Sequence, residues 1–68
     1  MENTVLRDGE QLLNATDVAH FLNISRAMAY RLMQHGKIRT VSIGTAKRVR
    51  TKDLRNFVEN NLSPMNEV

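Results

Sequence analysis

The stretch that decides the fold is Asn14-Ala-Thr-Asp-Val-Ala-His-Phe-Leu-Asn-Ile-Ser-Arg-Ala-Met-Ala-Tyr-Arg-Leu-Met-Gln-His-Gly36. Asn14 is a preferred helix N-cap residue, and Asp17 stands at the position that completes a capping box. Ser25 offers a second N-cap, and Gly36 is the residue type that most often occupies the left-handed position after a helix. The stretch therefore predicts two short helices, over 15–22 and 26–35.

The apolar residues of this stretch have the spacing of a helix-turn-helix unit. With Ala15 as its first position, the apolar and small positions fall on Val18, Ala19, Leu22, Ile24, Ala29 and Leu32. Asn23 stands in the turn, where asparagine tolerates a left-handed backbone. The same set of positions has to fit two helices and the tight turn between them, and this match favours a helix-turn-helix. Two amphipathic helices packed for stability alone remain the alternative.

The residues after Gly36 predict a β-hairpin. Polar and apolar residues alternate over 39–43 and again over 47–50, and Gly44-Thr-Ala separates the two runs. The alternation places Val41, Ile43 and Val49 on the inward face. It also places Arg48 and Arg50 side by side on the outer face of the second strand.

A third helix is expected to begin at Thr51 as its N-cap and to end before Pro64. Its expected apolar stripe is Leu54, Phe57, Val58 and Leu62. The predicted fold class is mainly α with a small β-hairpin, in the order of a winged helix-turn-helix domain. This domain is expected over 12–62, between flexible tails at 1–11 and 63–68.

Length and composition narrow the function classes. The chain has 68 residues and no cysteine, so a single small core holds it together without disulfides or thiolate zinc sites. His20 and His35 lack neighbouring ligands at a recognised metal spacing, and the carboxylates are scattered. We therefore expect no metal, no cofactor, no small-molecule ligand and no enzymatic activity. The chain shows no signal peptide and no run of about 20 apolar residues, which predicts a cytoplasmic protein.

The positive charge is concentrated in one part of the chain. The net charge is +3, but 26–55 holds nine of the ten Lys and Arg residues and one acid, giving +8 against −5 for the remainder. Such a segment suits nucleic acid or an anionic membrane surface, although an ordinary solvated face is equally consistent with charge alone. A membrane-binding helix would carry large apolar residues beside its cations, and the second helix offers mainly Met28 and Tyr30. A protein-interaction module using the basic face is the other alternative.

The second helix carries the first set of expected DNA contacts, which is Ser25, Arg26, Ala27, Tyr30, Arg31 and Gln34. Arginine and glutamine have the hydrogen-bonding groups that read guanine and adenine edges, and we expect Arg26 at a base and Arg31 at a base or a phosphate. Ser25 and the free amides at the helix start suit a phosphate. Tyr30 contacts the DNA backbone or is a half-buried structural tyrosine.

The hairpin and its flanks carry the second set of expected DNA contacts, which is Lys37, Lys47, Arg48, Arg50 and Lys52. These cations suit phosphates, and an arginine here also suits the minor groove. Their clustering beside a helix of groove-fitting size favours a role in binding over idle surface charge.

Several segments together carry a family resemblance. They are Leu12 to Arg26, Tyr30-Arg-Leu-Met, Gly36-Lys-Ile, Val41-Ser-Ile-Gly and Arg48-Val-Arg-Thr-Lys-Asp-Leu. The chain resembles the excisionase-type helix-turn-helix family, which is related to MerR-like winged-helix DNA-binding domains. The resemblance covers roughly 12–62 and implies that the second helix enters the major groove, with the hairpin as wing.

The resemblance also implies a biological role. Members of the family include recombination directionality factors, which bind and bend DNA beside an attachment site and help an integrase to excise. Other members are small transcriptional regulators, and the residues alone do not separate the two roles. The expected partners are double-stranded DNA, an integrase and adjacent copies on DNA, with nucleoid association in a bacterial or phage-infected cell.

Overall fold

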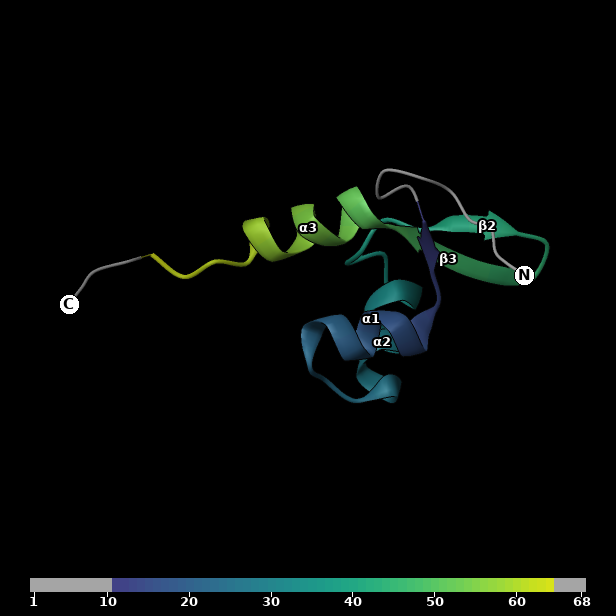
Figure 1. The fold of residues 1–68 in the computed structure, drawn as a ribbon, viewed down its shortest axis with the longest axis horizontal. Coiled ribbons are helices and arrows are strands. Elements are labelled where there is room, and N and C mark those ends of the chain that lie inside the picture. The colour runs from purple at the N-terminus through teal and green to yellow at the C-terminus, as the bar shows by residue number, and fades with distance from the viewer. Residues whose placement is uncertain (1–10, 65–68) are drawn as a thin grey trace.

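A computed structural model describes residues 11–64, so most of the predicted tails, 1–10 and 65–68, lies outside the described residues. The elements are β1 (Leu12–Leu13), α1 (Ala15–Leu22), α2 (Arg26–Gln34), β2 (Val41–Ile43), β3 (Ala46–Arg50) and α3 (Thr51–Asn60). In Figure 1, α1 and α2 lie below the sheet, while α3 and the β2–β3 hairpin extend in opposite directions. The predicted winged helix-turn-helix fold is confirmed.

The predicted capping box begins α1. The Asp17 backbone N–H donates to Asn14 Oδ1 at 2.8 Å, and the Asn14 N–H donates to Asp17 Oδ2 at 3.1 Å. The helix ends in a Schellman motif, in which Asn23 takes the left-handed conformation with φ 58°. The Ile24 N–H then donates to the Ala19 carbonyl at 3.0 Å. The predicted first helix and its turn are both confirmed.

Local signals also determine α2. Ser25 Oγ accepts a hydrogen bond from the Met28 N–H at 3.0 Å, as an N-cap does. The helix ends at Gln34, and Gly36 adopts the left-handed conformation with φ 72°. The Lys37 N–H closes this second Schellman motif by donating to the Leu32 carbonyl at 2.9 Å. The helix therefore stops one residue before the predicted end at His35.

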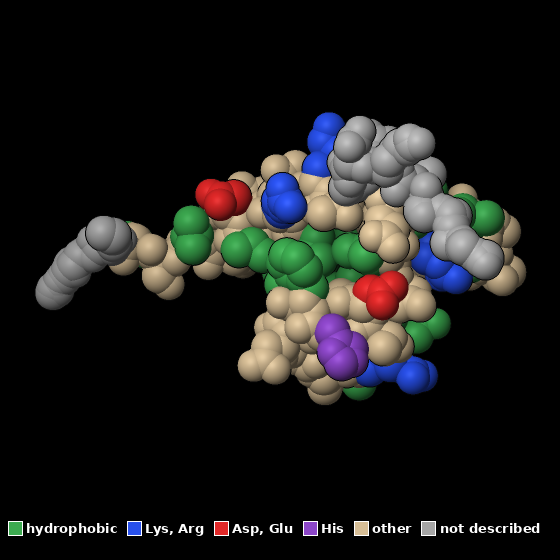
Figure 2. Space-filling model, in the orientation of Figure 1, with side chains coloured by type: hydrophobic (Ala, Val, Ile, Leu, Met, Phe, Trp, Pro, Cys, Tyr) green, Lys and Arg blue, Asp and Glu red, His purple; other side chains and the backbone are tan. Residues whose placement is uncertain are grey.

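One core joins the helices to the sheet. Its buried apolar side chains are Val18, Ala19, Ala29, Met33, Ile38, Val49 and Leu54. Figure 2 shows hydrophobic side chains gathered between α3 and the pair α1–α2. Ile38, only 1% exposed, is a core residue that the hydrophobic pattern did not identify, because it stands between cations in the loop after α2.

The register of the sheet corrects the predicted hairpin. The strand order is β1-β3-β2, and the added strand β1 pairs antiparallel with β3. Val41 pairs with Arg48, and Ile43 pairs with Ala46, so both apolar residues share the Arg48 face of the hairpin. Val49 lies on the opposite face and is fully buried, whereas Ile43 is 53% exposed. The prediction that Val41 and Ile43 face inward with Val49 was therefore wrong, although Val41 is half-buried.

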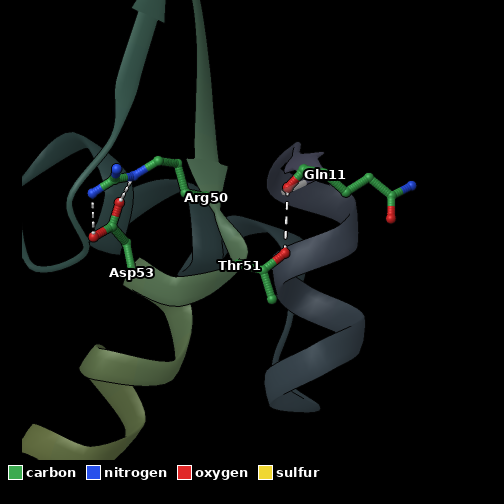
Figure 3. A network of polar contacts seen from close by, with 4 residues as sticks. All are labelled: Gln11, Arg50, Thr51 and Asp53. Carbon is green, nitrogen blue, oxygen red and sulfur yellow. Dashed lines mark hydrogen bonds and ion pairs between the residues drawn. The ribbon is translucent and has the colours of Figure 1, made fainter. Parts of the chain in front are cut away.

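The start and the apolar stripe of α3 also differ from prediction. The N-cap is Arg50, so Thr51 is the first helical residue, and its hydroxyl donates to the Gln11 carbonyl at 3.3 Å (Figure 3). Leu54 is buried, but Leu62 lies beyond the helix end at Asn60 and is 65% exposed. The predictions of Thr51 as N-cap and of Leu62 on the apolar stripe were therefore wrong.

Candidate nucleic-acid interface

The outward face of α2 divides into a central row and a flank. The buried side of the helix holds Ala29 and Met33, with Leu32 half-buried. At about 3.6 residues per turn, the positions opposite this side are Ala27, Arg31 and Gln34. Arg26 and Tyr30 lie on the flank between that row and Met33. All five of these non-core side chains are exposed.

The hairpin presents its cations on two faces. Lys47 shares a face of β3 with the buried Val49, and its Nζ donates to Ser42 Oγ on the paired strand at 3.3 Å. Arg48 lies on the opposite face, where Nη1 donates to the Lys47 carbonyl at 2.9 Å. The turn between the strands has Gly44 at φ 61°, as the first central residue of a type II′ turn requires. Thr45 is the second residue of this turn and lies next to the start of β3, where Lys47 stands.

Arg50 shares the Arg48 face of β3, but its guanidinium is held by α3. Nε and Nη2 donate to the two carboxylate oxygens of Asp53 at 2.6 and 3.1 Å (Figure 3). Asp53 is 4% exposed, and the hydrogen bond from Arg50 holds the pKa of its carboxyl below the ordinary value, against the opposing effect of burial. The positive charges of Arg50, Arg39 and Lys52 act in the same direction as the hydrogen bond. The pair therefore fastens β3 to the first turn of α3.

A cleft lies between the flank of α2 and the hairpin, with the start of α1 as its third wall. Its volume is about 410 Å³. Its lining residues are Asn14, Ala15, Thr16, Arg26, Tyr30, Met33, Gln34, Thr45, Ala46, Lys47 and Arg48. Five residues expected at DNA therefore meet around one cavity, although they come from two distant segments of the chain.

The cleft does not include every residue expected at DNA. Those outside its lining are Ser25, Ala27, Arg31, Lys37, Arg50 and Lys52. Ser25 is exposed at the start of α2, and Lys37 is exposed just after it. Conversely, Thr16 and Thr45 line the cleft but were not identified from the sequence. No local pattern marks them, because their proximity depends on the pairing of β1 with β3.

A family model described as a helix-turn-helix domain matches residues 12–62. The match spans all six elements of the described structure. The chain belongs to this helix-turn-helix family. The family is associated with excisionase-type DNA-binding proteins, and its domain implies sequence-specific DNA binding. Searches of curated proteins and of solved structures give no significant match.

The charges of this helix-turn-helix domain suit a polyanion. Among residues 11–64, the charged side chains that line the cleft are Arg26, Lys47 and Arg48, and no Asp or Glu of this range lines it. Among residues 11–64, no three His, Cys, Asp or Glu side chains form a group that would hold a metal ion. No helix in the same range is long and apolar enough to span a bilayer. The cations and the outward row of α2 together form the candidate DNA interface.

Proposed function

We propose that the protein is an excisionase-type accessory factor that binds and bends double-stranded DNA beside an attachment site and assists an integrase. The family match over 12–62 carries this proposal, because the family is associated with excisionase-type proteins. The fold agrees with it, since an exposed helix lies beside a basic hairpin. The protein acts by positioning DNA and has no catalytic step of its own. Its place of action is the nucleoid of a bacterial or phage-infected cell.

The dimensions of α2 suit the major groove. The helix has nine residues, or about 14 Å at about 1.5 Å per residue, and the groove is about 12 Å wide. Its outermost row offers Arg31 and Gln34 to base edges, and Ala27 offers a methyl group to thymine. This row gives the domain its sequence preference.

The flanking groups position the helix on the duplex. Ser25 stands at the N-terminus of α2, where free backbone amides favour an anion. The side chains of Lys37, Lys47, Arg48 and Lys52 supply phosphate contacts around the groove. Phosphate contacts fix the orientation of a protein on DNA and carry no sequence information themselves. Adjacent copies binding along DNA would add to the bend that each copy induces.

A reconstituted excision reaction tests the proposal. It combines the integrase of the same genetic element, DNA carrying its attachment sites, and the wild-type or a variant chain. We expect wild-type protein to shift and bend the attachment-region DNA and to raise the yield of excised product. The Arg31→Ala variant should lose this effect, whereas Arg55→Ala, which changes an exposed arginine of α3, should retain it.

Two results would contradict the excision role. One is unchanged excision in the presence of the protein and after deletion of its gene. The other is binding to a promoter region with a change in transcription and no effect on recombination, which would identify the protein as a small transcriptional regulator. DNA binding by α2 and the hairpin would stand in the second case.

A further inference from the structure

We infer that the cleft between α2 and the hairpin holds one phosphodiester group of the bound DNA strand, with Arg26 and Lys47 as its principal ligands. This inference rests on the proposed DNA-binding function and assigns a role within it. It changes the role of Arg26 from the base contact expected from the sequence to a phosphate contact. It also adds Thr16 and Thr45 to the interface.

The composition of the cleft wall identifies the ligand as an anion with several acceptor oxygens. Within the described part of the chain, the charged lining residues are all cationic, and the remaining polar side chains of the lining are hydroxyls and amides, which can donate hydrogen bonds. Among residues 11–64, the Arg26 side chain has neither an ion-pair nor a hydrogen-bond partner. Lys47 gives one hydrogen bond to Ser42, which leaves two of its three donors for a ligand. A phosphodiester satisfies these donors and neutralises the cations.

The start of α1 adds a smaller attraction to the same cavity. Asn14 caps the Asp17 N–H, and the preceding amides of Ala15 and Thr16 have no carbonyl partner within the helix. These groups line the cleft with the cations of α2 and the hairpin. A helix N-terminus carries partial positive charge, so it favours the same anion.

The position of Arg26 on the helix explains the change of role. Arg26 lies on the flank of α2 that faces the hairpin, whereas Arg31 lies in the row opposite the core. A strand backbone that runs between α2 and the hairpin would meet Arg26, and the base edges beyond it would meet Arg31 and Gln34. Arg26 is thus a residue for affinity, and Arg31 is a residue for specificity.

Binding selection and salt titration with Arg26→Gln, Arg31→Gln and Arg55→Gln test this division. Each protein selects sequences from a randomised duplex pool, and each affinity for the wild-type consensus is measured across salt concentrations. Arg26→Gln should select the same consensus and reduce the magnitude of the log–log salt slope by about 1. The ratio of wild-type to Arg26→Gln affinity should then fall about fourfold between about 50 and about 200 mM salt. Arg31→Gln should select a relaxed consensus, and Arg55→Gln should match wild type.

An unchanged salt slope for Arg26→Gln, with an altered consensus, would overturn the inference while leaving DNA binding intact. Failure of the wild-type chain to bind any duplex would overturn the proposed function itself. Circular dichroism of each variant confirms that the compared proteins are folded.

A nuclear magnetic resonance titration distinguishes a DNA phosphodiester from a free phosphate. Duplex DNA and inorganic phosphate are added separately to the wild-type chain, with chloride at equal ionic strength as the control. We expect DNA to shift the amide signals of Thr16, Thr45 and Lys47 and phosphate to shift them no more than chloride does. Saturable shifts with inorganic phosphate at these amides would instead assign the cleft to a small anion.

Discussion

The ion pair between Arg50 and Asp53 sets the attachment of the hairpin to α3, and Asp53→Asn tests its strength. The variant keeps the shape of the side chain but removes the charge that accepts both hydrogen bonds, at 2.6 and 3.1 Å. Hydrogen bonds to charged groups contribute about 1.5–3 kcal/mol to stability. Because the Arg50 side chain is 41% exposed, water weakens the pair, and we expect a loss of about 2 kcal/mol.

Thermal and urea unfolding, followed by circular dichroism at neutral pH, measure this loss. In a domain of this size about 1 kcal/mol corresponds to about 4–8 °C, so the melting temperature should fall by roughly 10 °C. Glu59→Gln is the matched control, because Glu59 is an exposed carboxylate of the same helix and its change should cost less than about 0.5 kcal/mol. A double-mutant cycle with Arg50→Gln should give a coupling free energy of at least about 1 kcal/mol. Equal stabilities of Asp53→Asn and Glu59→Gln, or no coupling between Arg50 and Asp53, would refute the stabilising role of this ion pair.

Three further outcomes follow from the same structure. Folding lowers the pKa of Asp53, so the stabilisation by its carboxylate is present above the ordinary carboxyl pKa of about 4 and is lost as the pH falls through the lower folded pKa. In urea titrations from neutral to acid pH, the difference in unfolding free energy between wild type and Asp53→Asn should therefore shrink over that range. Ile38→Ala should lower the free energy of unfolding by about 2–5 kcal/mol, whereas Ile43→Ala should cost less than about 0.5 kcal/mol; similar losses would contradict the observed register. Arg50→Gln should leave the salt slope of DNA binding unchanged when measured well below its melting temperature, and a slope smaller by about 1 would show that Arg50 contacts a phosphate.

The features that sequence predicted well are those whose causes are local. Asn14 and Asp17 satisfy each other three residues apart, and Ser25 caps its own helix. Asn23 and Gly36 end helices because their own backbone conformations allow it. Such interactions need no knowledge of the rest of the fold. They fixed both helices of the helix-turn-helix unit to within one residue.

The features that sequence missed depend on contacts between distant segments. The face of the sheet on which Ile43 lies follows from its pairing with Ala46. Alternation alone could not show which face of the hairpin is buried. Thr51 resembled an N-cap, but its hydroxyl bonds the carbonyl of Gln11, forty residues away. The candidate site shows the same limit. Its cations were predicted from charge clustering, whereas the cleft that groups Arg26 with the hairpin required the three-stranded sheet.

The salt dependence of duplex DNA binding tests the central claim most directly. If Arg26, Lys37, Lys47, Arg48 and Lys52 each neutralise a phosphate, the slope of log affinity against log salt should be about −4 to −5. The measurement needs the wild-type chain, a duplex and a series of chloride concentrations at one pH. A slope near −4.5, at about 0.9 per contact, would show that about five cations neutralise DNA phosphates, the number predicted for α2, the hairpin and their flanks. A slope near zero would contradict the account.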